Sequence, residues 1–264
     1  MKYLRFLMGE QGAVSGIGEP DGTIELIEGP ILGEHTRTGK KIKGHEIRRY
    51  LPPVDPPNII AVGRNYAEHA KELKHDLPTV PLLFMKATTS LTGHRCPVLV
   101  PAAAPHKVDY EAELVIVIGK KGKHIKPEEA AHYIFGYTIA NDISARDVQL
   151  EIDSQWIRGK SFDTFAPLGP AIETELDPSA LRVRMFLNGK CMQDGNTRDM
   201  IFPVPELVSF ISRHMTLLPG TVILTGTPSG VGYGREVPVF LKPGDQLAVE
   251  VEGIGRLENP VAAE

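Results

Sequence analysis

The stretch VDYEAELVIVIG, from Val108 to Gly119, decides how the rest of this chain is organised. Its second half is apolar, as in a strand that is buried on both faces. Residues two apart in a strand share a face, so Glu111 and Glu113 present their carboxylates side by side where the strand begins. Two like charges that lose their hydration together are costly unless a proton, an arginine or a divalent cation compensates them. The stretch therefore predicts a buried strand with a charge-compensated site at its start.

A third carboxylate is expected near this pair. Asp142 follows the stretch YTIAN and so lies just past another predicted strand. Three carboxylates without a neighbouring cysteine or histidine pair make an all-oxygen ligand set, which suits Mg²⁺, Mn²⁺ or Ca²⁺. A bound dication leaves about one negative charge on such a set, so a chelating anion can still bind. Spacing alone leaves two alternatives open: E-x-E as a solvated rim, and Asp142 as a turn or capping residue.

Prolines divide the chain into two parts. LPPVDPPN carries prolines at positions 52, 53, 56 and 57, and proline at this density fits neither a helix nor a central strand. Before it, short strands are predicted over residues 2–8, 12–17 and 23–27. We therefore expect a small β-rich N-terminal domain at residues 1–55 and a main domain at residues 56–264.

The main domain is expected to contain more strands than helices. Hydrophobic patterns and turn signals predict strands over residues 58–63, 81–87, 112–119, 135–142, 221–228 and 245–255. They predict helices over residues 64–75, 126–134 and 204–215. Asn65 is expected to cap the first of these helices, with Glu68 as its capping-box partner. Because strands and helices do not alternate regularly, we expect a mixed, mostly β architecture of the α+β type rather than a doubly wound sheet.

Composition excludes several classes of protein. The chain has 264 residues, of which 42% are hydrophobic and 23% charged, as in ordinary globular proteins. Its net charge of −4 offers no basic surface to a nucleic acid. No apolar run approaches the ~18–20 residues of a membrane helix, and MKYLRFLMGEQG does not resemble a signal peptide. Cys96 and Cys191 are expected to be reduced thiols, which fits a cytoplasmic protein.

Six longer stretches together resemble the fumarylacetoacetate hydrolase family over roughly residues 58–260. In chain order they are VDYEAELVIVIG, YTIANDISARDVQ, GKSFDTFAPLGP, LNGKCMQDGNTRDMIF, LLPGTVILTGTPSGVG and FLKPGDQLAVEVEGIGRLEN. The resemblance implies a mixed β-sandwich roll of the family's C-terminal type, preceded here by the small N-terminal domain. It also implies one divalent metal ion, usually Mg²⁺, and a homodimer.

The resemblance assigns roles residue by residue. Glu111 and Glu113 match the family's E-x-E acids, and Asp142 matches the acid of ND-x-S-x-RD, which implies that all three bind the metal. NYAEHAKE resembles the family element NYxxHxxE, whose histidine and glutamate activate a water. His69 and Glu72 are therefore expected to act together as the catalytic base and its partner. On a helix the two share a face, which lets the carboxylate orient the imidazole.

Further residues are expected to line the same site. Lys86 and Lys160 resemble family lysines that face the metal, Lys160 as a catalytic group that stabilises an oxyanion and Lys86 as a substrate-binding group. Arg146 and Gln149 lie at the spacing of one helical face and resemble substrate-side residues. Thr227, in TGTPSGVG, is expected to bind a substrate carboxylate. The alternatives are a structural ion pair for Arg146 and a plain loop for Thr227.

The expected activity also follows from the resemblance. Family members act on small molecules that carry a 2,4-dioxo acid or a related enol, through an enolate that the metal stabilises. Three branches stay open: C–C hydrolysis of the acylpyruvate type, isomerisation and decarboxylation of 2-hydroxyhepta-2,4-diene-1,7-dioate in aromatic catabolism, and oxaloacetate decarboxylation. The alternative from another class is a non-catalytic, cation-binding, oligomerising module. Such a module would have no use for His69, Glu72 or Lys160.

Overall fold

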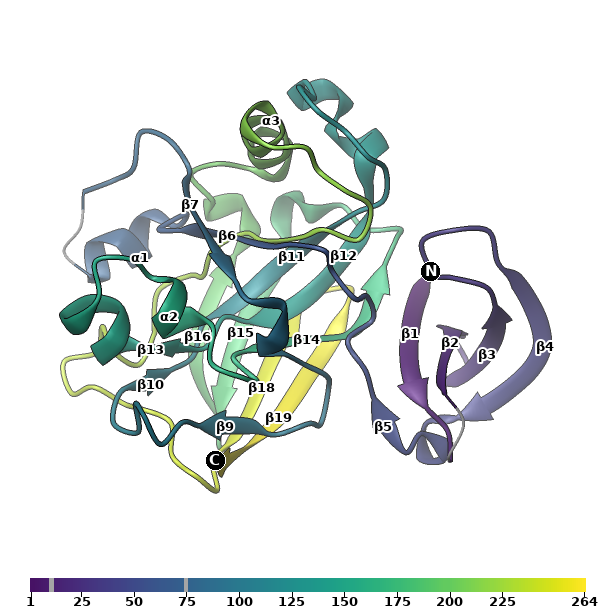
Figure 1. Cartoon of the computed structure of the whole chain (residues 1–264), viewed down its shortest axis with the longest axis horizontal. Helices are drawn as coiled ribbons and strands as arrows, with labels where there is room; N and C mark the ends of the chain where they lie inside the picture. Colours follow the sequence, from purple (N-terminus) through teal and green to yellow (C-terminus); the bar gives the residue numbers. More distant parts are fainter. Residues whose placement is uncertain (10–11, 74–75) are drawn as a thin grey trace.

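The computed structural model describes residues 1–9, 12–73 and 76–264. Within these residues the strands form a twelve-stranded sheet, a five-stranded sheet and a two-stranded pair (Figure 1). The chain is mostly β with a few short helices, as the sequence predicted. Among the described helices, none has both the length and the apolar character needed to cross a membrane.

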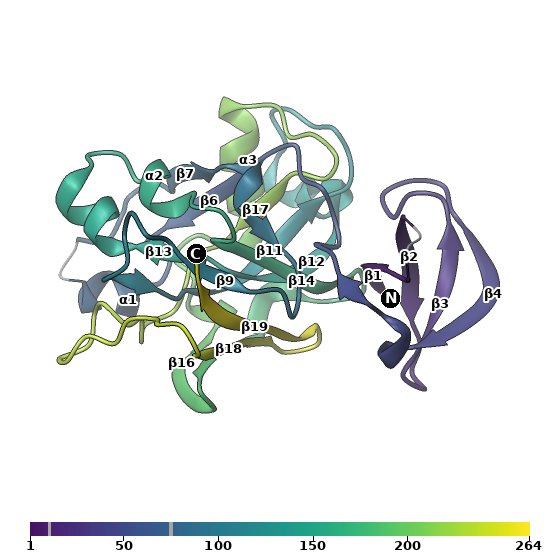
Figure 2. The same ribbon diagram turned by 60° about the horizontal axis from the view of Figure 1, so that its bottom comes forward.

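The N-terminal strands form an antiparallel unit at one end of the molecule, in purple in Figure 1 and in the same position in Figure 2. They are β1 (Lys2–Leu7), β2 (Ala13–Gly18), β3 (Thr23–Glu28), β4 (Thr36–Lys43) and β5 (Arg49–Tyr50). Phe6, Ile24 and Ile42 form a small core of their own. β1 also continues the large sheet, because Tyr3 pairs with Ile172. A domain boundary at residue 55 stays a prediction.

The remainder of the large sheet comes from the main part of the chain. Its strands are β6 (Ile59–Gly63), β7 (Leu82–Lys86), β8 (Leu91–Thr92), β11 (Ala112–Ile118), β12 (Ile134–Asn141), β14 (Ala166–Glu173) and β17 (Val222–Leu224). β11 lies between β12 and β17 and is antiparallel to both. β17 pairs in parallel with β6, which pairs with β7. β11 is buried along its whole length, as its apolar sequence predicted.

The second sheet covers one face of the first. It consists of β9 (Val98–Val100), β15 (Arg182–Leu187), β16 (Lys190–Asn196), β18 (Gln246–Val251) and β19 (Gly255–Ala263), and Figure 2 shows β16, β18 and β19 beneath β11, β12 and β14. The short strands β10 (Val108–Asp109) and β13 (Ser144–Ala145) pair beside the site. Leu114 packs into a core with Val249 of the second sheet. Val115, on the opposite face of β11, packs into a core that includes Tyr3. β11 is therefore apolar on both faces because each face meets a different core.

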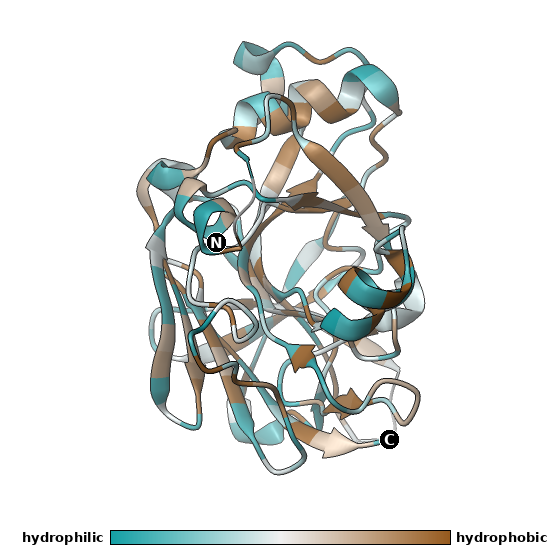
Figure 3. Ribbon diagram, turned by 90° about the vertical axis from the view of Figure 1, so that its left-hand side faces the viewer, coloured by the Kyte–Doolittle hydropathy of each residue, from teal (hydrophilic) through white to brown (hydrophobic). Residues whose placement is uncertain are grey.

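Helices are short and lie outside the sheets. They are α1 (Ala67–Glu72), α2 (Ile157–Lys160) and α3 (Val204–His214), with brief 3₁₀ or π turns at η1 (Gly44–Glu46), η2 (Thr88–Ser90), η3 (Pro127–Tyr133), η4 (Val148–Ile152), η5 (Pro178–Ala180) and η6 (Thr197–Asp199). α3 agrees with the helix predicted over residues 204–215, and it buries Leu207 and Ile211. In Figure 3 the helices carry both colours, whereas long parts of the inner strands are brown.

The first predicted helix of the main domain begins later than expected. α1 starts at Ala67, and the predicted end at residues 74–75 lies outside the described residues. Asn65 does not cap it. Its fully buried side chain accepts a hydrogen bond from Phe202 N at 2.8 Å and donates to the carbonyls of Phe202 and Thr225 at 3.0 and 2.8 Å. The Asn65 side chain therefore bonds to residues far away in the sequence instead of capping the helix next to it.

Two predicted strands end early because glycines turn the chain. The strand predicted over residues 221–228 ends at Leu224, and Gly226 adopts a φ of 97°. A Cβ on Gly226 would lie 2.8 Å from the Cβ of Asn65, so only glycine fits there. The strand predicted over residues 245–255 is two strands, β18 and β19, joined by a turn with Gly253 at a φ of 79°. β4, β14, β15 and β16 were not predicted.

Candidate active site

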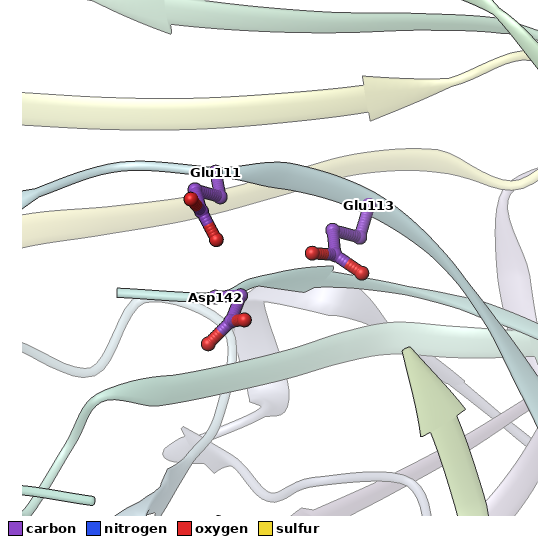
Figure 4. Close-up of side chains that lie close together, drawn as sticks. All are labelled: Glu111, Glu113 and Asp142. Carbon is purple, nitrogen blue, oxygen red and sulfur yellow. The ribbon is translucent and has the colours of Figure 1, made fainter. Parts of the chain in front are cut away.

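Three carboxylates converge where β11 begins and β12 ends (Figure 4). One oxygen from each of Glu111, Glu113 and Asp142 lies within 4.8 Å of the others, and all three side chains are buried. The sheet sets this geometry, because Ala112 pairs with Asn141 and so places the acids on either side of that pair together. The Asn141 side chain also accepts a hydrogen bond from Glu111 N at 2.9 Å. Strand pairing thus holds the three acids that the sequence singled out in one cluster.

Two buried lysines neutralise part of this charge. Lys160, at the end of α2, lies between two of the acids, with Nζ 2.6 Å from Glu111 Oε2 and 2.7 Å from Asp142 Oδ2. Lys86, the last residue of β7, has Nζ 2.5 Å from Asp142 Oδ1 and also donates to the Ile143 carbonyl. Burial lowers the pKa of Lys86 to about 8, although Asp142 opposes the shift. Both predicted lysines therefore contact the carboxylate cluster directly.

Arg146 forms a buried ion pair and lines the cavity as well. Its Nη2 lies 2.7 Å from Glu111 Oε1, and its Nε donates to Asp109 Oδ2 at 2.8 Å. Its Nη1 donates to Gln149 Oε1 at 3.0 Å, which brings the predicted Arg146 and Gln149 into contact. Asp109 also accepts hydrogen bonds from the backbone N–H groups of Gly232, at 2.7 Å, and Tyr233. We refer to the seven charged residues of this cluster as the ionic floor: Glu111, Glu113, Asp142, Asp109, Lys86, Lys160 and Arg146.

Burial and neighbouring charges shift the two floor glutamates in opposite directions. Burial raises the pKa of Glu113 well above its ordinary value, and the nearby Asp142 and Glu111 add to the rise. Burial also opposes ionisation of Glu111, but Lys160 and Arg146 outweigh it and hold the pKa of Glu111 below its usual range. Glu113 is therefore the floor carboxylate whose charge the surrounding protein compensates least.

The histidine and the glutamate that the sequence singled out lie together on α1. His69 is buried, and its Nδ1 lies 3.2 Å from Glu72 Oε2. Glu72 in turn accepts hydrogen bonds from Gly230 N, at 3.0 Å to Oε1 and 3.2 Å to Oε2. The glycine-rich loop after β17 thus holds the carboxylate that contacts the imidazole. We refer to His69 and Glu72 as the α1 dyad.

One cavity joins the floor to the α1 dyad. Its lining includes His69, the triad of acids, Arg146, Gln149, Lys160 and Thr227. Thr227 Oγ1 donates to the Ala112 carbonyl at 3.0 Å and accepts from Gln193 Nε2 at 2.7 Å. Glu72 and Lys86 support this lining through their contacts with His69 and Asp142. The structure therefore gathers all ten predicted site residues around a single cavity.

Several residues of the site escaped the sequence prediction. Asp109 stands two residues before Glu111, so the alternation D-x-E-x-E could have indicated a third acid in line. Gln193 and Asn65 carry no comparable signal, because their partners are far away in the sequence. Arg64 and Trp156 also line the cavity, and they too carry no sequence signal that could have indicated this.

The floor fits a hard divalent cation. Glu113 accepts a hydrogen bond from Gly226 N at 2.7 Å, and no described cation forms an ion pair with it. A dication held by oxygens of Glu111, Glu113 and Asp142 would supply the missing positive charge and would favour the ionised form of Glu113. Carboxylate oxygens without sulfur or nitrogen donors are typical ligands of Mg²⁺, Mn²⁺ and Ca²⁺. The buried triad could therefore hold a metal ion.

Fold and site together define a mostly β protein with a buried, carboxylate-lined cavity of the kind that holds a divalent cation. A sequence model described as "Fumarylacetoacetate (FAA) hydrolase C-terminal" matches residues 58–262. The chain belongs to the fumarylacetoacetate hydrolase family.

Three relatives show which enzymes this chain is similar to. The mitochondrial oxaloacetate tautomerase Fahd2a of Rattus norvegicus is 44% identical over 216 residues, which cover 80% of this chain and 69% of the relative. The structure of 5-carboxymethyl-2-hydroxymuconate delta-isomerase from Mycobacterium smegmatis covers all of both chains at 41% identity and a TM-score of 0.88. The structure of 2-hydroxyhepta-2,4-diene-1,7-dioate isomerase from Mycobacterium marinum covers 100% of this chain and 99% of that chain, at 38% identity and a TM-score of 0.87. Each of the three is named for an isomerisation or a tautomerisation.

Proposed function

We propose that the protein is a Mg²⁺-dependent enzyme that acts on 2,4-dioxo acids or related enols by moving a proton at the carbon beside the 2-oxo group. The observation that carries the proposal is that the three carboxylates and His69 line the same cavity. A bound divalent cation would polarise the 2-oxo group and so lower the cost of forming an enolate. The relatives named above support this choice, because isomerisation and tautomerisation both need such a proton shift.

The charges of the floor favour an anionic substrate. With every group ionised, the four carboxylates of the floor exceed its three cations by one charge. A bound dication changes this balance to one net positive charge. A substrate that brings a carboxylate and a second, partly negative oxygen restores neutrality in a site from which water is largely excluded. A 2-oxo acid offers these two oxygens side by side.

His69 is the base in this proposal. The Glu72 carboxylate can only accept a hydrogen bond, so Nδ1 of His69 carries the proton between them and Nε2 keeps its lone pair. In isomerisation or tautomerisation, Nε2 takes a proton from one atom of the substrate and returns it to another. In C–C hydrolysis it takes the proton of the water that attacks the distal carbonyl. Glu72 acts through His69 and is a positioning residue.

The buried cations hold the substrate in this proposal. Lys160 lies between Glu111 and Asp142 and can donate to a substrate oxygen that becomes negative during the reaction. Arg146 and Gln149 already contact each other, and Thr227 is held by its hydrogen bond to the Ala112 carbonyl. C–C hydrolysis of the acylpyruvate type and oxaloacetate decarboxylation are the alternative outcomes of the same site. We expect the enzyme to work as a homodimer on a small molecule.

A substrate panel tests the proposal. The purified chain, stripped of metal with EDTA and then supplied with Mg²⁺, Mn²⁺ or Ca²⁺, is mixed with acylpyruvates, a 2-hydroxydiene dicarboxylate and the enol of oxaloacetate. We expect metal-dependent turnover of at least one of them, with deuterium from solvent incorporated beside the 2-oxo group. Full activity in excess EDTA would exclude the metal role. A cation that binds without turnover of any substrate would favour the non-catalytic module.

A further inference from the structure

The lining of the cavity includes an arginine whose charge no described group neutralises. Arg64 lines the cavity, yet its guanidinium forms neither an ion pair nor a hydrogen bond with any residue that the structure describes. Asp76 lines the adjoining surface groove together with Arg64 but makes no ion pair with it. Burial lowers the pKa of Arg64, so its charged form gains from an anionic neighbour. A partly buried cation of this kind is a candidate partner for an anionic group on a ligand.

Arg64 rests on an aromatic side chain that is itself fixed. Its guanidinium carbon lies 5.6 Å from the ring centre of Trp156, within the range of a cation–π contact. A Cβ on Gly63 would lie 2.6 Å from the indole, so glycine at this position lets Trp156 lie against the end of β6. Trp156 also meets Phe84 edge to face, with ring centres 5.4 Å apart. The Arg64 guanidinium therefore packs against a ring that is itself held in place by its neighbours.

Contacts through two aromatic rings link the floor to Arg64. Lys160 Nζ lies 5.1 Å from the ring centre of Phe84, Phe84 contacts Trp156, and Trp156 contacts Arg64. Phe84, Trp156, Arg64 and Lys160 all line the same cavity. This series of contacts thus begins and ends with a cation and has two aromatic rings in between. This pattern matches a ligand with two anionic ends joined by a short carbon chain.

The backbone holds Arg64 in a conformation that few side chains adopt. Its φ of 57° places it in the left-handed region, where residues other than glycine, asparagine and aspartate are uncommon. The following residue, Asn65, is fully buried and anchored by its hydrogen bonds to Phe202 and Thr225. The position of the Arg64 Cα therefore follows from contacts deep in the protein and is set before a ligand binds.

We propose that Arg64, supported by Trp156, forms a second anion subsite that binds the distal carboxylate of the substrate. The preferred substrates are then 2-oxo dicarboxylates, with the 2-oxo acid end at the floor and the other carboxylate at Arg64. The inference rests on the proposed function, which assigns the floor to the 2-oxo acid end. In addition to the proposed function, the inference assigns to Arg64 the discrimination between substrates whose distal end is charged and substrates whose distal end is neutral.

Matched pairs of 2-oxo acids test the subsite without requiring turnover. We would measure dissociation constants for the full chain with saturating Mg²⁺, using 2-oxoglutarate, 2-oxoadipate and 2-oxopimelate. Each is paired with the monocarboxylate that ends in a methyl group: 2-oxopentanoate, 2-oxohexanoate and 2-oxoheptanoate. In the unmodified protein, the best pair should favour the dicarboxylate by about tenfold or more, the worth of a charge-assisted hydrogen bond. In Arg64→Gln this preference should fall to about twofold or less, with little change for the monocarboxylate.

Two further variants separate the subsite from a general effect of charge. Arg158 lies on α2, two residues after Trp156, and is paired with Asp153, so Arg158→Gln removes one positive charge and should leave the preference unchanged. Arg64→Lys keeps the charge but loses the planar fork, so it should keep part of the preference. Equal binding of both acids by the unmodified protein, or an equal loss in Arg64→Gln and Arg158→Gln, would overturn the subsite while leaving the proposed function intact. If no 2-oxo acid binds in the presence of Mg²⁺, the proposed function and the subsite both fail.

Discussion

The ionic floor and the α1 dyad are two halves of one site, but different kinds of structure hold them. The three clustered acids Glu111, Glu113 and Asp142 lie directly beside the paired residues Ala112 and Asn141 of β11 and β12, in a sheet that is buried on both faces. The dyad lies on a helix of six residues that has no side-chain cap. A helix this short has little stability of its own. Its place depends on Asn65 at one end and on the contact of Glu72 with Gly230.

The difference suggests a division of labour between binding and proton transfer. Groups that must hold a cation need fixed oxygens, and neighbouring strands of a sheet supply them. A base must reach its proton and release it again, and a helix attached through a loop allows the small movements that this needs. Changes in the floor should therefore affect binding of metal and substrate together, whereas changes in the dyad should affect catalysis while binding is kept.

The largest effect is expected for Asp142→Asn. Asp142 belongs to the acid triad and is also the shared partner of Lys86 and Lys160, so its neutral form leaves two buried cations with too little compensation. We expect Mg²⁺ affinity to fall by at least about 10²-fold, the upper range for loss of a group that merely supports a metal ligand. Activity should fall further than in any other variant discussed here. Calorimetric Mg²⁺ titration and steady-state turnover measure the two quantities.

Glu25→Gln is the matched control for this variant. Glu25 is a buried glutamate in β3, and it pairs with Arg37 away from the site. It should lose neither Mg²⁺ affinity nor turnover. Asp142→Asn with normal Mg²⁺ affinity, measured on protein shown to be folded by circular dichroism, would remove Asp142 from the metal site.

A smaller and more selective loss is expected for His69→Ala. A positioned general base contributes about 10² to 10⁴ in rate, so proton transfer or C–C hydrolysis should fall by a factor in that range. Oxaloacetate decarboxylation, if the enzyme performs it, should fall much less, because the leaving CO₂ starts as a carboxylate. Mg²⁺ affinity should not change. Turnover of both reactions under saturating Mg²⁺ gives the comparison, with the exposed His132→Ala as control. Equal losses in both reactions would make His69 a structural or substrate-binding residue.

The raised pKa of Glu113 predicts how the metal-free protein responds to pH. A group whose pKa is higher in the folded state stabilises the fold below its unfolded pKa and loses that effect as pH rises through the folded value. Metal-free protein should therefore lose up to about 1.4 kcal/mol of stability per pH unit as the pH rises from the ordinary pKa of a glutamate, about 4.3, toward neutral. Lys86 stays protonated over this range, because its pKa is about 8. Glu111 stays ionised there, because its pKa is held below its usual range.

Urea unfolding in EDTA measures this effect, with Glu113→Gln as the comparison. The variant has no carboxyl group to titrate at this position, so its stability should change less with pH. Saturating Mg²⁺ should also flatten the profile of the unmodified protein, because the bound cation favours the ionised glutamate. Parallel profiles for the unmodified protein and the variant in EDTA would contradict the assignment.

The smallest effect on the site is expected from a cut in the proline segment. None of the described residues of the N-terminal unit lines the cavity, so this unit provides a third region for the comparison. We expect limited proteolysis to cleave near residues 52–57 or within residues 35–46, with Mg²⁺ binding kept as long as the fragments stay together. Mass spectrometry locates the cut. If residues 58–264 are cleaved as readily as residues 1–50, the predicted boundary at residue 55 is wrong.

The floor was the most predictable part of the site because it depends on local periodicity. Glu111 and Glu113 share a face through the two-residue repeat of a strand, and Asp142 stands at the end of the next predicted strand. The family resemblance added the dyad and the lysines. Asn65 shows where local reasoning fails, because buried hydrogen bonds to distant residues outweighed the single bond of a helix cap.

The parts that the sequence did not predict depend on pairing and packing across long distances. β4 reads TRTGKKIK and is exposed except at Ile42, so it lacks the apolar alternation of a half-buried strand. Its lysines are typical of a sheet edge that must not pair further. Arg64 and Trp156 meet only because β6 and α2 approach each other, and no spacing along the chain indicates that contact.

The position of β17 between β11 and β6 has a consequence for the order of events when the chain folds. Thr225, just past β17, bonds to the Leu114 carbonyl across 111 residues of sequence, and Gly226 N reaches Glu113. A ribosome must therefore release residues well beyond 200 before the cation site can be complete, and closing so long a loop is slow. We expect the refolding rate to be independent of Mg²⁺ and the unfolding rate to fall with it, as stopped-flow measurements would show. The ion would then slow the unfolding of the native protein without taking part in its folding.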